Sequence, residues 1–160
     1  MRIGIMSDTH GSLDAVARAV SLAGPVDMWL HAGDCIADAE HLSIISGVPV
    51  HNVAGNCDWP NMTVPEERLI DVAGHCILLT HGHNYGVRYD TEILIEAAEE
   101  RGADIAVYGH THIAEISPGD EVYVLNPGSA ARPRDEMRPS FMVVTLEPGK
   151  KPEAELVRME

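Results

Sequence analysis

The first sixty residues repeat one pattern three times, a short apolar run followed by a polar loop. The apolar runs cover Arg2–Met6, Val26–Leu30 and Pro49–Val53. Apolar residues at helical spacing predict helices between these runs, over Leu13–Ala23 and about Asp38–Ile45. This β-α-β-α-β order predicts an α/β protein with a parallel sheet and helical crossovers. Ligand-binding groups in such sheets gather beyond the carboxyl ends of the strands.

The polar loops contain the side-chain types that bind divalent metals. Asp8 and His10 follow the first run, Asp34 follows the second, and Asn56 follows the third. Three separate strands therefore deliver carboxylate, imidazole and amide groups to one edge of the expected sheet. This regularity favours a metal site at that edge.

The second half of the chain predicts a hairpin, a helix and several more strands. The hairpin pairs 68–72 with 76–80, and the helix covers about 90–101. Further strands are expected at 105–108, 113–117, 121–125, 141–146 and, as an edge strand, 153–159. No linker or repeat interrupts the chain, so residues 1–160 are expected to form one domain.

Two histidines separated by one residue, in Gly109-His110-Thr111-His112, follow the apolar run 105–108. Residues i and i+2 of a strand share a face, so both imidazoles can point into one site. Imidazole is a common metal ligand. A lone His-x-His is equally compatible with surface or packing histidines, so its interpretation depends on the other loops.

Charge and composition exclude several classes of partner. The 160 residues carry a formal net charge of −14, which disfavours stable binding to nucleic acid or to an anionic membrane. No apolar run approaches the ~20 residues of a membrane span, and the first residues lack a signal-peptide pattern. The three cysteines do not suggest a disulfide framework. A cytoplasmic location is therefore expected.

The candidate metal ligands are more numerous than the ligands of a single structural metal site. They are Asp8, His10, Asp34, Asn56, His81, His110 and His112. A tetrahedral zinc site takes about four ligands, whereas this set suits two divalent ions that share a bridging carboxylate. Mixed nitrogen and oxygen ligation without thiolate favours manganese, with nickel, zinc or iron as alternatives, over calcium or magnesium.

Five motifs in order carry a family resemblance. They are Asp8-x-His10, Gly33-Asp34, Gly55-Asn56-x-Asp58, Thr80-His81-Gly82-His83 and Gly109-His110-x-His112. This series resembles the calcineurin-like metallophosphoesterase superfamily, and most of all its small single-domain bacterial and archaeal phosphodiesterases (YfcE type). The resemblance implies a four-layer α/β/β/α sandwich of two mixed sheets flanked by helices. The glycines Gly11, Gly33, Gly55, Gly82 and Gly109 are each expected to let the backbone turn sharply beside the metals without a Cβ clash.

The resemblance also divides the candidate ligands between two metals. One metal would be held by Asp8, His10 and His112 and the other by Asn56, His81 and His110, with Asp34 bridging them. Two cations of about +4, against about −3 from two carboxylates and a bridging hydroxide, would attract a phosphate ester. The hydroxide would attack phosphorus in line, with Asp34, Asn56, His110 and Cys57 as the expected catalytic residues.

Cys57 departs from the wider superfamily, in which many members have a histidine at this position that assists the leaving group. A thiol replaces imidazole poorly at neutral pH. The sequence therefore predicts small phosphodiesters with good leaving groups, such as aryl esters, in preference to alkyl monoesters. Alternatively, Cys57 only fills a tight turn.

Substrate contacts are expected from Asn56, His83, Arg132 and Arg134. Arginine suits bidentate contact with phosphate, although both arginines could belong to a solvated loop. His83 could instead be a loop histidine bonded to the backbone. Asp58 is expected either to orient a neighbouring group or to form a turn.

The alternative function is a non-catalytic protein-interaction scaffold on the same fold, as in the retromer subunit that resembles this subgroup. Scaffolds tend to lose metal-binding histidines, and here every ligand position is filled, which favours the enzyme. A homodimer or higher homo-oligomer is compatible with Met28, Trp29 and Trp59, which are expected to be exposed.

Overall fold

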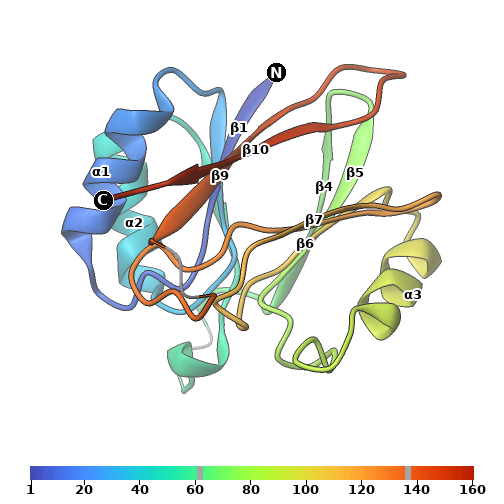
Figure 1. Cartoon of the computed structure of the whole chain (residues 1–160), viewed down its shortest axis with the longest axis horizontal. Coiled ribbons are helices and arrows are strands. Elements are labelled where there is room, and N and C mark those ends of the chain that lie inside the picture. The colour runs from blue at the N-terminus through green and yellow to red at the C-terminus, as the bar shows by residue number, and fades with distance from the viewer. Residues whose placement is uncertain (61–62, 136–137) are drawn as a thin grey trace.

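The computed structural model describes residues 1–60, 63–135 and 138–160 and contains two five-stranded sheets (Figure 1). The first sheet has the order β10-β9-β1-β2-β3. Its strands are β1 (Arg2–Met6), β2 (Met28–His31), β3 (Val50–Asn52), β9 (Ser140–Thr145) and β10 (Glu153–Arg158). β1, β2 and β3 run parallel, while β9 and β10 are antiparallel to their neighbours. The final strand lies at the sheet edge, as the sequence predicts.

The second sheet is also mixed and has the order β4-β5-β6-β8-β7. Its strands are β4 (Glu67–Val72), β5 (His75–Thr80), β6 (Ile105–Val107), β7 (Glu115–Pro118) and β8 (Tyr123–Asn126). The predicted hairpin is β4–β5, and the predicted pair over 113–125 is β7–β8. β6 pairs in parallel with both β5 and β8.

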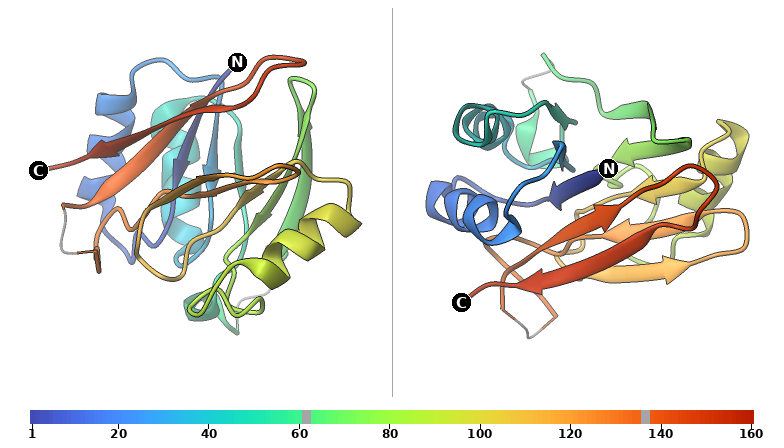
Figure 2. Two further views of the ribbon diagram at one scale, coloured as in Figure 1. Left: turned by 45° about the vertical axis from the view of Figure 1, so that its right-hand side comes forward. Right: turned by 90° about the horizontal axis from the view of Figure 1, so that it is seen from above.

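Three helices cover the outer faces of the two sheets within the described residues (Figures 1 and 2). α1 (Leu13–Ala23) and α2 (Ile36–Ser46) pack on the first sheet, and α3 (Glu92–Glu100) packs on the second. The apolar core accordingly has three parts. Ile5 and Leu79 lie in the part between the sheets, whereas the other two parts lie between each sheet and its helices. The four-layer α/β/β/α sandwich is confirmed. No helix of the described residues is long and apolar enough to cross a bilayer.

Trp29 is buried, and the prediction that it is exposed is wrong. Only 1% of its surface is exposed, and its ring lies 6.0 Å from that of Phe141. A Cβ at Gly4 would lie 2.4 Å from the Trp29 ring, so the absence of a side chain on β1 makes room for the indole. β2 is a central strand covered on both faces, and such strands bury both sets of side chains. Trp59, by contrast, is 73% exposed.

His31, at the end of β2, is a buried neutral histidine. Its Nδ1 accepts the Gly33 N–H at 3.2 Å, and its Nε2 lies 3.0 Å from Thr9 Oγ1. Burial lowers the pKa of His31 to about 4, although the Asp8 and Asp38 carboxylates oppose this effect. Protonation of Nδ1 would also break the bond to Gly33.

The protein is expected to lose stability below pH ~6.5 through His31. The unfolded chain binds a proton there as the pH falls, whereas the folded chain binds it only near pH 4. The resulting loss between these limits is about 3 kcal/mol of unfolding free energy. Urea unfolding gives the unfolding free energy of the wild type and of His31→Gln at several pH values between 7.5 and 4.5. The contribution of His31 is the difference between the two proteins in how steeply this free energy changes with pH. An equal pH dependence of the unfolding free energy in the two proteins would contradict this role of His31.

Candidate metal centre

The loops that follow β1, β2, β3, β5 and β6 meet at one end of the sandwich and are joined by main-chain hydrogen bonds. The Asp8 N–H donates to the Gly33 carbonyl, and the Gly109 N–H donates to the His81 carbonyl, each at 3.0 Å. Both bonds connect loops that are far apart in sequence. The ends of the parallel strands therefore place their polar residues together, as the strand order predicts.

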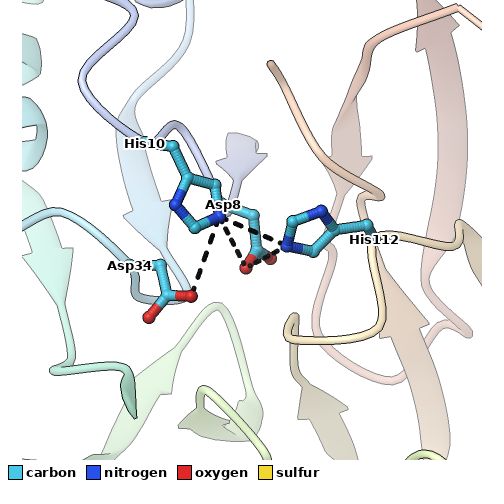
Figure 3. A group of neighbouring side chains, drawn as sticks. All are labelled: Asp8, His10, Asp34 and His112. Atoms are coloured by element: carbon cyan, nitrogen blue, oxygen red, sulfur yellow. Dashed lines mark hydrogen bonds and ion pairs between the residues drawn. The ribbon is translucent and has the colours of Figure 1, made fainter. Parts of the chain in front are cut away.

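Four of the predicted ligands form one compact group. Asp8, His10, Asp34 and His112 each offer a ligand atom, and these atoms lie within 4.8 Å of one another. Figure 3 shows the four side chains pointing toward a common centre. His112 Nε2 lies 3.1 Å from Asp8 Oδ1, and His10 Nε2 lies 3.8 Å from both Asp8 Oδ1 and Asp34 Oδ2.

The other three predicted ligands lie next to this group. His81 Nε2 is 3.3 Å from Asp34 Oδ2, and His110 Nδ1 is 3.1 Å from Asn56 Oδ1. The rings of His81 and His110 are 5.1 Å apart. Asp34 Oδ2 therefore lies between His10 of the first group and His81 of the second. This position suits a bridging carboxylate.

Two buried atoms of the centre lack hydrogen-bond partners among the described residues. They are Asp8 Oδ1 and His81 Nε2, which lie 3.7 Å apart. Leaving a buried polar atom unpaired is costly, so such atoms call for a ligand. His81 Nδ1 bonds to the Ala32 carbonyl at 2.7 Å, which leaves the Nε2 lone pair directed at the centre. The oxygen and nitrogen donors fit a divalent cation.

Backbone strain concentrates at the same residues. Seven non-glycine residues of the described chain have a positive φ. Five of them are predicted ligands: Asp8, His10, Asp34, His110 and His112. Left-handed backbone is uncommon for residues other than glycine, although Asp and His adopt it more readily than most, and it often occurs at functional sites. The strain therefore marks these loops independently of the ligand chemistry.

Several glycines beside the ligands avoid a Cβ clash, as expected, but not all of them form a sharp turn. Gly33 has a φ of +100° and does form a sharp turn. Gly55 has an extended backbone with a φ of −94°, but a Cβ there would lie 2.1 Å from Asp34 Oδ1. A Cβ at Gly109 would likewise lie 2.0 Å from Ser7 Oγ. Gly55 and Gly109 are therefore required for close approach of loops and not for a turn.

Burial, hydrogen bonds and neighbouring charges set the protonation of the candidate ligands. Burial alone would raise the pKa of Asp34, but the adjacent His81 imidazole and the Cys57 N–H hold that pKa well below its usual range. Burial would lower the pKa of His81, yet the carboxylates of Asp34 and Asp8 raise it. Burial, helped by His81 and Arg88, lowers the pKa of His110 to about 4 and keeps this imidazole neutral.

Asp58 joins two of the site loops. Its Oδ2 accepts the N–H groups of Asp34 at 3.1 Å and Gly55 at 2.7 Å, and its Oδ1 accepts the Ile36 N–H at 3.0 Å. This carboxylate holds the loop of Asp34 against the loop of Asn56. Both roles considered for Asp58 are present, since it orients Asp34 and Ile36 and its bonds to Gly55 close the 3-10 turn Asn56–Asp58.

Removing the Asp58 carboxylate is expected to weaken the metal centre. Asp58→Ala leaves three N–H groups without their acceptor, and loss of such outer partners typically costs about 10- to 100-fold in metal affinity or activity. Titration of the metal-free protein with Mn²⁺ measures the effect, and Asp120→Ala in the β7–β8 turn is a matched control. Unchanged affinity in Asp58→Ala would contradict this role.

Arg132 and Arg134 contact the centre through their main chain. The Arg132 carbonyl lies 2.6 Å from His112 Nδ1, and the Arg134 N–H donates to the His112 carbonyl at 3.0 Å. Both residues are exposed. The main chain thus orients His112, a role that the sequence did not predict, and contact of the side chains with substrate stays a prediction.

Cys57 and His83 lie at the margin of the centre. The Cys57 N–H donates to Asp34 Oδ1 at 3.0 Å, and its side chain is exposed. Partial burial and the charge of Asp34 raise the pKa of the Cys57 thiol to about 11. The His83 ring lies 5.5 Å from that of His81 and 6.2 Å from that of His110. His83 is therefore near the ligands, whereas its role in substrate binding stays a prediction.

Three residues that contact the candidate ligands were not predicted. Ser7 Oγ donates to Asp8 Oδ2 at 2.6 Å, and Ser129 Oγ donates to the Asp8 carbonyl at 2.7 Å. Arg88 Nε donates to His110 Nε2 at 3.1 Å. Only the position of Ser7, directly before Asp8, was a usable signal in the sequence.

Comparisons with known proteins identify the family of the chain. Residues 1–149 match a family model described as the calcineurin-like phosphoesterase superfamily domain. A probable metallophosphoesterase of Bacillus subtilis, YsnB, is 34% identical over 92% of this chain and 85% of the relative. A phosphodiesterase of Methanocaldococcus jannaschii is 31% identical over 80% of this chain and 83% of the relative.

Solved structures share the fold over nearly the whole chain. A predicted phosphoesterase from Streptococcus pneumoniae matches with a TM-score of 0.83 and 27% identity, covering 98% of this chain and 88% of that one. Zinc-bound Vps29 from Entamoeba histolytica matches with a TM-score of 0.79 and 25% identity, covering 98% of each chain.

Proposed function

Since the chain belongs to the calcineurin-like phosphoesterase superfamily, we propose that it is a phosphodiesterase that binds two divalent cations and hydrolyses small phosphodiesters. The observation that carries this proposal is the convergence of Asp8, His10, Asp34 and His112 around the unpartnered Asp8 Oδ1. Manganese is the cation we expect, on the basis of the mixed imidazole and carboxylate donors.

The proposed roles follow from the two groups of ligands. Asp8, His10 and His112 would hold one cation, and Asn56, His81 and His110 would hold the other, with Asp34 shared between them. When bound, two such cations lower the pKa of a water molecule and offset the charge of a phosphate ester. The chain itself keeps Asp34 ionised and His110 neutral, so that both offer lone pairs near neutral pH.

The test is metal analysis combined with hydrolysis of bis(p-nitrophenyl) phosphate and p-nitrophenyl phosphate under Mn²⁺, Ni²⁺, Zn²⁺ and Mg²⁺. We expect about two metals per chain and faster hydrolysis of the diester. No hydrolysis with any metal, despite full metal occupancy, would overturn the enzyme and favour the interaction scaffold. The likeness to Vps29 leaves that alternative in place but does not favour it.

Replacing Cys57 with histidine is expected to broaden the leaving groups that the protein accepts. A positioned general acid contributes about 10²- to 10⁴-fold, and imidazole fills this role better than a thiol near neutral pH. The ratio of alkyl-ester to aryl-ester hydrolysis should therefore rise in Cys57→His, by about 10-fold or more. Cys57→Ser, which keeps the size but adds no such acid, is the control. An unchanged ratio would show that Cys57 only fills the turn.

A cytoplasmic location, the assignment of residues 1–160 to one domain, and assembly into a homo-oligomer stay predictions. Gel filtration with light scattering tests the last of these. Of the two tryptophans proposed for such an interface, Trp29 is buried, so Trp59, which is exposed, is the one that stays a candidate.

A further inference from the structure

Arg88 lies at the rim of the proposed metal centre but belongs to none of the five sequence motifs. It is exposed and lies in the loop between β5 and α3, where its Nε donates to His110 Nε2 at 3.1 Å. On the other side of the same ring, His110 Nδ1 lies 3.1 Å from Asn56 Oδ1. Arg88 therefore borders the group of ligands formed by Asn56, His81 and His110.

The loop holds Arg88 in place through the residue before it. Val87 is only 6% exposed and packs with Leu78 and Tyr108 in the core part beneath α3. The loop also contains two tight turns, closed by the bonds from Tyr85 to Gly82 and from Tyr89 to Gly86. An exposed guanidinium is thus carried by an anchored backbone, which lowers the entropy lost when it binds a ligand.

No carboxylate of the described residues pairs with Arg88, although the chain has 25 acidic and only 11 basic side chains. Arg101, Arg138 and Arg158 each form an ion pair with a carboxylate. The Arg88 side chain bonds to the neutral imidazole of His110, which leaves the positive charge of the guanidinium uncompensated. A guanidinium in this state suits a phosphate oxygen.

The hydrogen bond to His110 cannot coexist with metal ligation by the same ring. A neutral imidazole has one lone pair, and Arg88 Nε uses it at Nε2. If a cation binds His110 Nδ1, the ring proton moves to Nε2, which then no longer accepts a hydrogen bond. If the cation instead binds Nε2, it occupies the lone pair that accepts from Arg88. Binding of a cation by His110 would therefore release the Arg88 guanidinium beside the site.

We propose that Arg88 is a substrate-binding residue that clamps a non-bridging oxygen of the phosphate ester once His110 holds its cation. This inference rests on the proposed function and adds a residue to it. The substrate class it implies is an anionic phosphodiester whose phosphate approaches the side of the centre formed by Asn56 and His110. Arg88 is not a metal ligand, so its removal should leave both cations bound.

The experiment compares Arg88→Ala and Arg88→Lys with Arg18→Ala, a matched loss of an exposed arginine on α1. Calorimetric titration of the Mn²⁺-loaded proteins with inorganic phosphate measures binding without requiring turnover. The KM and kcat for bis(p-nitrophenyl) phosphate and the metal content are measured on the same samples.

We expect phosphate to bind about 10- to 100-fold more weakly to Arg88→Ala, because a charge-assisted hydrogen bond is lost. KM should rise to a similar extent, while Arg88→Lys recovers part of the loss and Arg18→Ala equals the wild type. Metal content should remain that of the wild type in all three variants.

Phosphate binding and KM within twofold of the wild type in Arg88→Ala would overturn the proposal. A fall in metal content would also overturn it, since Arg88 would then act by orienting His110. If the wild type hydrolyses no ester at all, the proposed function fails, whereas the calorimetric titration still decides the role of Arg88 in phosphate binding.

Discussion

Asp34→Asn is expected to abolish hydrolysis of phosphodiesters, with a fall in kcat/KM of at least about 10³-fold. Asp34 Oδ2 lies between His10 and His81, and its other oxygen is held by the Cys57 N–H. An amide has the same shape but carries no charge, and it presents one oxygen where the carboxylate presents two. Neither cation would then gain the shared negative charge that keeps the two together.

Steady-state kinetics and metal analysis by mass spectrometry measure both parts of this effect. Asp120→Asn, which removes a carboxylate from the exposed β7–β8 turn, is the matched control and should behave as the wild type. Circular dichroism establishes that the Asp34→Asn protein is folded. Retention of more than about a tenth of the wild-type activity would exclude Asp34 as the bridging ligand.

His110→Ala and His112→Ala are each expected to lose one metal of two, and to lose different ones. His112 Nε2 lies 3.1 Å from Asp8 Oδ1, whereas His110 Nδ1 lies 3.1 Å from Asn56 Oδ1. The two imidazoles are two residues apart in sequence, but their nearest partners, Asp8 and Asn56, belong to different groups of candidate ligands. Each variant should lose activity by at least about 10²-fold, since both cations act on the same phosphate.

Metal content per chain measures this directly, with titration by Mn²⁺ to resolve the remaining site. Combining each variant with Asp8→Ala distinguishes the two sites. Asp8→Ala should add little to the metal loss of His112→Ala. In His110→Ala, by contrast, it should remove the metal that the single variant retains. His41→Ala, on α2, is the control. Loss of both metals in either single variant would show that the two sites do not fill independently.

The fold was largely predictable because its elements depend on local sequence. Ser12 accepts the Ala15 N–H and begins α1, and Gly47 ends α2 in the left-handed conformation that glycine favours. The beginning of α2 was less predictable. This helix begins at Ile36, whose N–H is accepted by Asp58 from a loop 22 residues away. No neighbouring residue in the sequence signals that bond.

Burial of a side chain was predictable only on strands whose sheet has one covered face, where alternate residues are buried. Trp29 lies on a strand flanked on both sides and covered on both faces, and its indole occupies the space left open by Gly4. The order of strands in the sheet decides this environment, and the sequence of β2 does not reveal it. The close approaches at Gly55 and Gly109 were hidden for the same reason, because the atoms that a Cβ would meet belong to other loops.

The sequence by itself determined the set of candidate metal ligands, because residue identity fixes donor chemistry and each donor follows an apolar strand in order. The tertiary structure decided how these side chains are oriented. It supplies the Ala32 and Arg132 carbonyls that direct His81 and His112, the Asp58 bonds that join two loops, and the contact of Arg88 with His110. These partners lie 20 to 49 residues apart in the chain. Their meeting depends on the order of strands within each sheet and on how the two sheets pack, which are long-range properties that no local pattern encodes.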